Sequence, residues 1–380
     1  MGFRVGRRAF VLGAAAAGLA GCDRTPAMPE NFATPWREET GQAARYFSQY
    51  THDLNDGVAL SPDGGLFAAT LYGAPVNELA LIDPKARTTQ VLADGDRRLR
   101  LAQPAFSPDG KSLVVVRAAP PTFTGRAELV IVDLATGQGR RIGERLSYAW
   151  PTFAPDGKSL VYWGDTKQPP PRSRMQPEYR EFVDFALFRL DLASGAETRL
   201  DPRTFVAPSQ VAALADGRVL FTAIYETTDG VLLPPTVECE NRLLGARVLA
   251  AAQEPPKGCA VSAINAHDPL LDGAKLRGAA RDGRLLLENG RAEPAVQSFA
   301  VIWDGTTATF VAPPPPGVQE PAVNLDGSTV AGVMYDVLDP KGARTLKARI
   351  FVQDLATGAQ AVFDPPAPSA RLTLTAPTGL

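Results

Sequence analysis

A short turn phrase recurs along this chain, and its spacing constrains the fold more than any other feature. Ser61-Pro62-Asp63-Gly64 returns as Ser107-Pro108-Asp109-Gly110 and as Ala154-Pro155-Asp156-Gly157, and weaker copies end in Asp216-Gly217, Asp282-Gly283 and Asp326-Gly327. Successive copies are 46, 47, 60, 66 and 44 residues apart. A period of about 40–45 residues that links tight turns to short apolar runs is typical of a β-propeller, with one blade per repeat.

The second repeat indicates how one blade is built. Its apolar runs cover 103–106, 111–116, 127–132 and 139–142. Between the first two runs, proline fixes φ, aspartate hydrogen-bonds its own backbone and Gly110 supplies a positive φ. A second turn, Asp133-Leu-Ala-Thr-Gly137, separates the last two runs. We therefore expect four antiparallel strands and two tight turns in each blade.

The second turn also recurs, at 83–87, 191–195, 304–305 and 354–358. The fourth repeat has no clear copy and is about 20 residues longer than the second, too little for another blade. We therefore expect an all-β, six-bladed propeller, with seven blades as the alternative if the diverged ends form one. A structural role in turns is predicted for Asp63, Gly64, Asp109, Gly110, Asp156, Gly157, Asp216, Gly217, Asp326 and Gly327.

The two turn series resemble those of the TolB-like propeller repeat, and the resemblance covers roughly residues 55–365. It implies a propeller of the same kind. TolB itself carries an α/β domain before its propeller, whereas about 30 residues separate the leader from the first blade here, so we do not expect TolB itself. Prolyl oligopeptidases have similar blades followed by a hydrolase domain. No Gly-x-Ser-x-Gly motif occurs in this chain.

The N-terminal segment has the features of an export signal. Arg4, Arg7 and Arg8 precede an apolar run over 9–20, which is too short to span a bilayer. Leu19-Ala20-Gly21-Cys22 then resembles the bacterial lipobox, which implies lipidation of Cys22. An ordinary secretory leader with a chance cysteine is the alternative.

Residues 6–12, Gly-Arg-Arg-Ala-Phe-Val-Leu, resemble a twin-arginine export signal, and Asp23 resembles an inner-membrane retention signal. The alternative to a twin-arginine signal is a merely basic leader. We expect a signal peptide over 1–21, a lipidated N-terminus and tether over 22–50, and a β-propeller over 51–380. The expected location is the periplasmic side of a bacterial membrane, with the inner membrane favoured.

Charge and cysteine content bear on partners and compartment. Removal of 1–21 removes three arginines and no acidic residue, so the formal net charge falls from −2 to −5, which argues against a nucleic-acid surface. Cys239 and Cys259 remain as an even pair in an oxidising compartment, and we expect a disulfide. It would close a loop of about 20 residues and contribute roughly 3 kcal/mol. Two buried free thiols are the alternative.

Residues with catalytic potential are few. His52 and His267 are the two histidines, and no metal-binding or phosphate-binding motif occurs. We expect no cofactor, no metal site and no catalytic residue, and enzymatic activity is the less favoured hypothesis. The alternative is a propeller hydrolase or lactonase that holds Ca²⁺ through oxygen ligands in the central channel. Asn55, Asp56, Glu226 and Asp336 lie outside the repeated turns and would be its candidates.

The irregular segments are predicted to gather on the face opposite the tight turns, where we expect a protein or envelope component to bind. The longest insert in a regular blade is 164–182, and its Pro-rich stretch carries Arg172, Arg174, Met175, Tyr179 and Arg180. We predict these five as partner-binding residues, with a plain surface loop as the alternative. A glycan-binding propeller is a third hypothesis and would need exposed aromatic side chains such as Trp150, Trp163 and Trp303.

Overall fold

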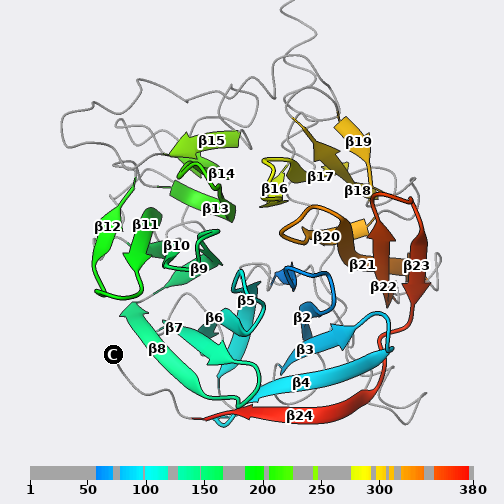
Figure 1. Ribbon diagram of the computed structural model, residues 1–380, viewed down its shortest axis with the longest axis horizontal. Coiled ribbons are helices and arrows are strands. Elements are labelled where there is room, and N and C mark those ends of the chain that lie inside the picture. Colours follow the sequence, from blue (N-terminus) through cyan, green and yellow to red (C-terminus); the bar gives the residue numbers. More distant parts are fainter. Residues whose placement is uncertain are drawn as a thin grey trace, which may run out of the picture.

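The computed structural model is all-β, and its strands form five sheets arranged around a common centre (Figure 1). No helix long and apolar enough to cross a membrane occurs in the part of the chain that is described. The described residues are 57–71, 78–96, 99–118, 127–145, 147–165, 185–200, 205–225, 243–246, 275–291, 297–304, 308–311, 318–337 and 346–375.

Four of the sheets are built in the order of their strands along the chain. The first holds β1 (Val58–Leu60), β2 (Phe67–Leu71), β3 (Glu78–Asp83) and β4 (Thr88–Asp94), with β24 (Pro368–Leu374) beside β4. The second holds β5 (Arg100–Phe106), β6 (Ser112–Ala118), β7 (Ala127–Asp133) and β8 (Gly139–Arg145). The last two hold β16 (Lys275–Ala279), β17 (Leu285–Arg291), β18 (Gln297–Trp303) and β19 (Ala308–Phe310), and β20 (Val318–Val323), β21 (Thr329–Val337), β22 (Leu346–Asp354) and β23 (Gln360–Phe363).

The remaining sheet has seven strands and two turn phrases. It contains β9 (Tyr148–Phe153), β10 (Ser159–Asp165), β11 (Phe185–Asp191), β12 (Glu197–Arg199), β13 (Phe205–Ala213), β14 (Val219–Tyr225) and β15 (Leu243–Ala246). Strands β11 and β13 are joined through a single residue pair, Phe185 with Phe205. The predicted β-propeller arrangement is therefore confirmed, whereas the count of six blades is not, because the described strands form five sheets.

The core lies between neighbouring sheets rather than within one. Consecutive side chains of a strand point to opposite faces, so in β6 Val114 packs toward β10 and β11, while Val115 packs toward β2 and β3. Both side chains are fully buried. A strand covered on both faces needs a continuous apolar run, which explains the sequence Leu113-Val-Val-Val116.

The first and last sheets of the chain pack against each other and close the ring. Leu60 and Phe67 share a buried cluster with Ala331, Ile350 and Phe363. The Asn324 side-chain amide also donates to the carbonyl oxygen of Pro62 at 3.3 Å. This contact joins the first and last turn phrases directly.

Strand β24 crosses the outer edge of the first sheet as a strap. It pairs with β4 in parallel, whereas the other strand pairs of the structure's described part are antiparallel. Its end reaches the next sheet, where Thr375 N–H donates to the carbonyl oxygen of Gly137 at 3.2 Å. Leu374 is buried there among residues of two sheets. No strand was predicted at this position from the sequence.

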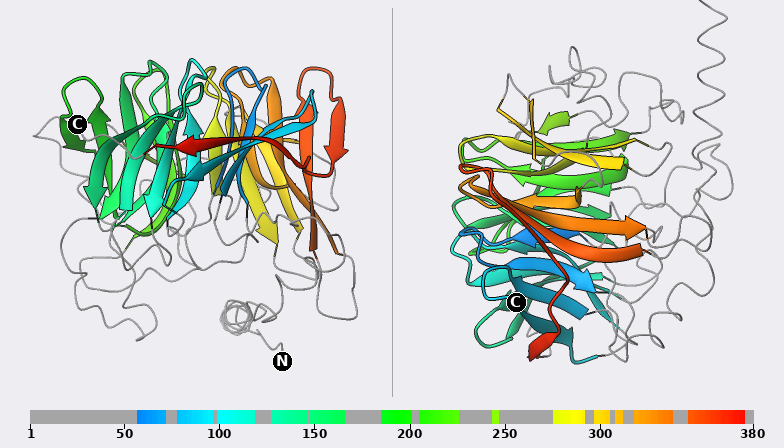
Figure 2. Two further views of the ribbon diagram at one scale, coloured as in Figure 1. Left: turned by 90° about the horizontal axis from the view of Figure 1, so that it is seen from below. Right: turned by 90° about the vertical axis from the view of Figure 1, so that its right-hand side faces the viewer.

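The strands give the ring two different faces. Tight turns join the first and second strands of each set on one face, as where Gly110 N–H donates to the carbonyl oxygen of Ser107 at 2.9 Å (Figure 2). The terminal pairs Ala118–Ala127, Asp165–Phe185 and Val337–Leu346 lie at the opposite ends of their strands. We call these faces the tight-turn face and the loop face.

Candidate functional site

Several residues singled out in the sequence lie outside the described part of the chain. These are Cys22, Cys239 and Cys259, the insert residues Arg172, Arg174, Met175, Tyr179 and Arg180, and the possible metal ligands Asn55, Asp56 and Glu226. Asp336 belongs to β21, but its side chain is not described. The predictions that rest on these residues stay predictions. Among the described residues, no group of three or more His, Cys, Asp or Glu side chains could hold a metal ion.

The turn aspartates are engaged by their own turns. In each turn phrase an aspartate Oδ1 accepts the backbone N–H two residues later, at 2.8–3.1 Å. The following glycines have φ between 70° and 92°. Hydrogen bonds from Ser107 Oγ and the Lys111 N–H hold the pKa of Asp109 below its usual range. The turn aspartates and glycines therefore maintain the backbone geometry of the turns, and a functional site must be sought among other residues.

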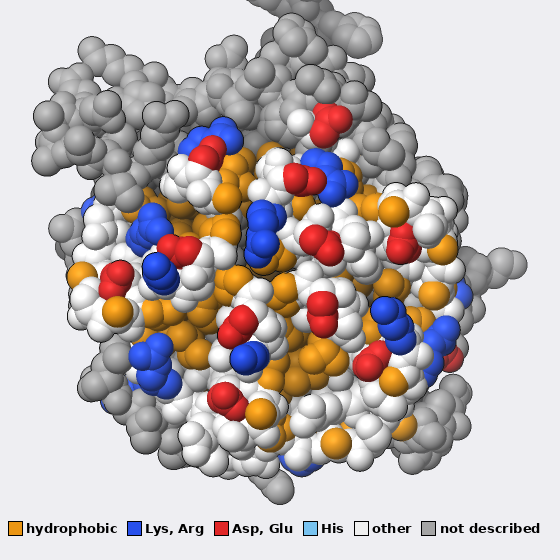
Figure 3. All heavy atoms as spheres, in the orientation of Figure 1, with side chains coloured by type: hydrophobic (Ala, Val, Ile, Leu, Met, Phe, Trp, Pro, Cys, Tyr) orange, Lys and Arg blue, Asp and Glu red, His pale blue; other side chains and the backbone are white. Residues whose placement is uncertain are grey.

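A cavity of about 120 Å³ opens at the centre of the tight-turn face. Figure 3 shows hydrophobic side chains gathered around the centre of this face, with acidic and basic side chains distributed around them. The inner strands β1, β5, β9, β13, β16 and β20 supply the walls. Most of the lining is apolar, and it includes Leu60, Pro62, Pro104, Phe106, Pro108, Phe153, Pro155, Val211, Val323 and Leu325.

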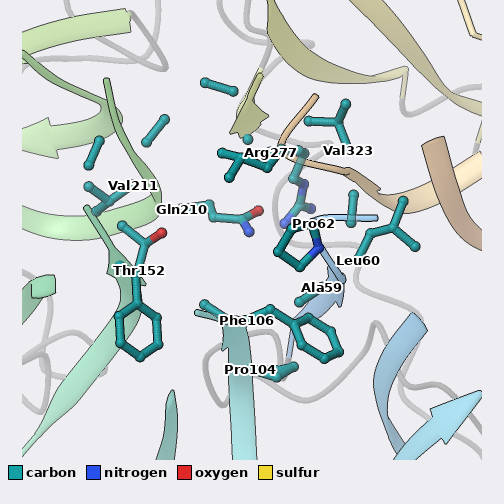
Figure 4. A pocket seen from close by; sticks show the side chains of 18 of the residues that line it. Ala59, Leu60, Pro62, Pro104, Phe106, Thr152, Gln210, Val211, Arg277 and Val323 are labelled. Atoms are coloured by element: carbon teal, nitrogen blue, oxygen red, sulfur yellow. The ribbon is translucent and has the colours of Figure 1, made fainter. Parts of the chain in front are cut away.

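Three polar side chains interrupt the apolar wall: Thr152, Gln210 and Arg277. Figure 4 shows the amide of Gln210 and the guanidinium of Arg277 extending into the cavity from the adjacent strands β13 and β16. Arg277 is 6% exposed, and its Nε and Nη2 both lie 2.5 Å from Glu288 Oε2. The channel mouth is therefore an apolar cavity with one polar corner.

Bulges on the inner strands produce this arrangement. Strand register shifts between Ala102 and Ala105 in β5, and the same happens in β9, β13, β16 and β20. A bulge inserts an extra residue and re-aims its side chain. In β16 the extra residue is Arg277, because Leu276 and Gly278 pair with the consecutive residues Leu287 and Leu286.

Two bulge residues adopt the left-handed conformation that usually favours glycine. Gln103 has φ of 51° and Trp150 has φ of 49°, and each precedes a proline. Gly57, at the matching position in the first repeat, has φ of 67°. A Cβ on Gly57 would stand 2.8 Å from Trp150 Cζ3, so the indole packs directly on that glycine. We did not predict these bulges from the sequence. The one sequence feature that indicates them is the proline three residues before the second, third and last turn phrases.

The aromatic side chains considered for glycan binding are buried where they are described. Trp150 is 5% exposed, and Trp163 is fully buried in an edge contact with Phe221 at 4.9 Å between ring centroids. The side chain of Trp303 is not described. Trp150 and Trp163 therefore do not provide the exposed aromatic surface that glycan binding would need.

Arg145, Tyr162 and Glu197 form a group of polar contacts at the end of β10, where the long insert begins, and we call this group the polar seam. Arg145 Nη1 donates to the carbonyl oxygen of Asp165 at 2.8 Å, and Asp165 N–H donates to the carbonyl oxygen of Ser147 at 3.2 Å. Arg145 also pairs with Glu197, whose other oxygen accepts the Tyr162 hydroxyl. Burial raises the pKa of Tyr162, and the bond to Glu197 raises it further. The end of β10 is thus held firmly at the loop face.

Comparison with known proteins supports the fold. TolB from Acinetobacter baumannii superposes with a TM-score of 0.52 at 15% sequence identity, over 83% of this chain and 66% of TolB. The chain thus spans about two thirds of TolB's length. At this identity the match indicates the β-propeller architecture alone, and TolB-like β-propeller proteins are among the structural neighbours.

Weaker structural matches include two further proteins. The β-propeller domain of the Trilobed protease from Pyrococcus furiosus matches at 15% identity over 80% of this chain and 84% of that domain, with a TM-score of 0.43. Oligogalacturonate lyase from Vibrio parahaemolyticus matches at 14% identity over 82% and 77% of the respective chains, with a TM-score of 0.46. The sequence matches no protein-family model and none of the curated proteins with which it was compared.

Proposed function

We propose that this protein is an exported, lipid-anchored β-propeller that serves as a binding or scaffold protein for a protein or cell-envelope component. The partner binds the loop face. The observation that carries this proposal is the position of the strand ends that flank the longest insert. Asp165 and Phe185 pair at the loop face, and Arg145 of the polar seam anchors Asp165 to β8 of the second sheet. A rigid scaffold that presents an elaborated loop is a common arrangement for binding sites.

We also propose that the ring has six blades. The seven-stranded sheet contains two turn phrases, 154–157 and 214–217, and each follows its own inner strand, β9 or β13. One residue pair connects the two strand sets, Phe185 with Phe205. Strand pairing between the two sets is limited to this one position, which supports two neighbouring blades that pack against each other rather than one continuous sheet.

Replacement of 166–182 by a short Gly-Ser linker tests the proposal. The replacement begins after Asp165, because that residue is 1% exposed and belongs to β10. Surface loops exchange at low cost in closure entropy, so the melting temperature should be preserved. Partner capture from solubilised membranes, measured by cross-linking and mass spectrometry, should be lost.

A finer test is an alanine scan of Arg172, Arg174, Met175, Tyr179 and Arg180 in the intact insert. Interface energy concentrates in a few residues, so one or two of these variants should reproduce most of the loss. Unchanged capture by the linker variant, with an intact melting curve, would remove the partner site from the insert.

Export and anchoring are tested separately. Cys22→Ser should leave an unprocessed or soluble precursor, and equal membrane partitioning of variant and wild type would contradict lipidation. Joint replacement of Arg7 and Arg8 by lysine should block export if the twin-arginine route is used. Mass mapping under non-reducing conditions should find Cys239 linked to Cys259 in periplasmic material, whereas two free thiols would contradict the disulfide.

The hydrolase or lactonase alternative is not favoured by the observations on the described residues. It predicts stoichiometric Ca²⁺ in the purified protein and an activity that chelation removes. Elemental analysis of the exported protein distinguishes it from the binding role.

A further inference from the structure

Arg277 lines the channel and stands at a sequence position that is apolar in each of the other repeats. It stands three residues before the first residue of its turn phrase. The corresponding residues of the other repeats are Val58, Pro104, Pro151, Val211 and Pro321. As the extra residue of the β16 bulge, Arg277 is displaced from regular pairing and aimed into the cavity.

The hydrogen bonds of Arg277 leave one donor group available. Nε and Nη2 are both committed to Glu288, and among the described residues Nη1 has no hydrogen-bond partner. The neighbouring Gln210 is half-buried, and its amide extends into the same space. Nη1 is not one of the buried side-chain atoms that lack a hydrogen-bond partner, so it is accessible from the cavity and can donate to an incoming oxygen atom.

We propose that the channel mouth binds a small neutral molecule that carries a primary amide on a compact, branched apolar stem. The amide oxygen accepts from Arg277 Nη1, and the amide of Gln210 pairs with the ligand's remaining donor. The stem lies against Pro62, Phe106 and Val323. A cavity of about 120 Å³ suits a ligand of this size, since an engineered apolar cavity of about 150 Å³ holds benzene.

Glu288 decides between a neutral amide and a carboxylate. It is 6% exposed and already neutralises Arg277. A carboxylate ligand would place a second negative charge beside this pair in a largely desolvated site, and such a charge is strongly penalised. A neutral carbonyl oxygen takes the same hydrogen bond without that penalty. The site therefore selects the amide over the acid of the same shape.

The test compares two isosteric probes, isobutyramide and isobutyrate, titrated against the full-length mature protein by saturation-transfer NMR. Isobutyramide should bind at least about tenfold more tightly than isobutyrate, which is about 1.4 kcal/mol at 25 °C. Equal or tighter binding of isobutyrate would overturn the proposal. Failure of isobutyramide to bind at concentrations of tens of millimolar would overturn it as well.

Two variants locate the binding. Gln210→Leu should weaken isobutyramide about five- to tenfold, because it removes one hydrogen-bonding group, whereas Gln360→Leu, at an exposed position of β23, should leave it unchanged. Arg277→Met alone would strand a buried carboxylate, so it is combined with Glu288→Gln. The double variant should lose both binding and the preference for amide over acid. Wild-type affinity in Gln210→Leu and in the double variant would refute the site.

The 166–182 linker variant separates this inference from the proposed function. That replacement lies at the loop face, so isobutyramide should still bind with unchanged affinity. Loss of partner capture with amide binding intact would support two independent sites. Loss of amide binding in the linker variant would overturn the assignment to the channel mouth.

Discussion

Gln103 Oε1 accepts a hydrogen bond of 2.7 Å from the backbone N–H of Trp150, so a side chain of β5 completes the pairing of the neighbouring inner strand. Both residues sit in bulges, where the extra residue loses its ladder partner. Gln103 is 3% exposed, so no solvent replaces the bond. The Gln103 side chain therefore provides an acceptor for the Trp150 N–H, which has no partner in the strand pairing because of the bulge in β9.

The first prediction follows from this bond. Gln103→Leu keeps a side chain of similar size but leaves the Trp150 N–H buried without an acceptor. The free energy of unfolding should fall by about 1–3 kcal/mol, measured by urea denaturation. Gln360→Leu, at an exposed position of β23, is the control and should change stability little. A loss no larger than that of the control would show that the bond contributes nothing.

The second prediction concerns the glycine beneath the indole. Gly57→Ala places a Cβ 2.8 Å from Trp150 Cζ3 at φ of 67°, so it combines backbone strain with a steric clash. Gly110→Ala has nearly the same φ, 72°, but its Cβ would meet Pro62 at an ordinary 3.6 Å. Gly110→Ala should cost about 1–2 kcal/mol, and Gly57→Ala should cost clearly more. Equal losses in thermal unfolding would mean that the indole gives way freely.

The parts of the fold that could be predicted are those whose cause lies within a few residues. A turn such as Ser107-Pro-Asp-Gly110 carries its own φ preferences and hydrogen bonds. Its repetition in phase with β-branched runs indicates a propeller, because each face of Val114-Val115 needs a neighbouring sheet. The division of the described strands into five sheets depends instead on how Phe205 meets Phe185, and no local signal reports that.

The candidate site could not be predicted, because it depends on the register in which the inner strands pair with their neighbours. Whether Arg277 lies in the ladder or in a bulge depends on how Leu276 and Gly278 align with β17. A one-residue shift moves a side chain to the other face. The parallel pairing of β24 with β4 could not be predicted for a similar reason, since it joins residues about 280 positions apart in the sequence.

The third prediction uses the pH dependence of the turns. The Ser107 hydroxyl donates to Asp109 at 2.6 Å and, with the Lys111 N–H, lowers the pKa of that carboxyl in the folded state. A lowered folded pKa contributes stability above the unfolded value of about 3.9 that is lost as the pH falls through the folded pKa. Ser107→Ala should therefore lower the melting temperature at pH 7 more than at pH 3. A difference that is independent of pH would assign the effect to the Ser112 N–H bond alone.

The fourth prediction is a gain of stability in the third turn. Ala154 matches Ser107, and both residues make the same backbone hydrogen bonds across their turns. Ala154→Ser would supply a hydroxyl that reaches Asp156 and the Ser159 N–H, as Ser107 reaches its partners. The free energy of unfolding should rise by about 0.5–1.5 kcal/mol. A lower melting temperature in Ala154→Ser would show that the third turn has no room for the hydroxyl.

The last prediction concerns the β24 strap. Leu374 is 2% exposed and shares a buried cluster with Leu79, Leu92 and Val130, which come from two sheets. Leu374→Ala should destabilise the fold by about 2–5 kcal/mol, and hydrogen exchange should quicken in β4, its pairing partner. Leu372→Ala is the matched control, because that side chain is only partly buried and should cost less. Equal, small losses from both variants would mean that the strap rests on the ring without holding it closed, whereas a large loss from Leu374→Ala alone identifies the strap as part of the ring closure.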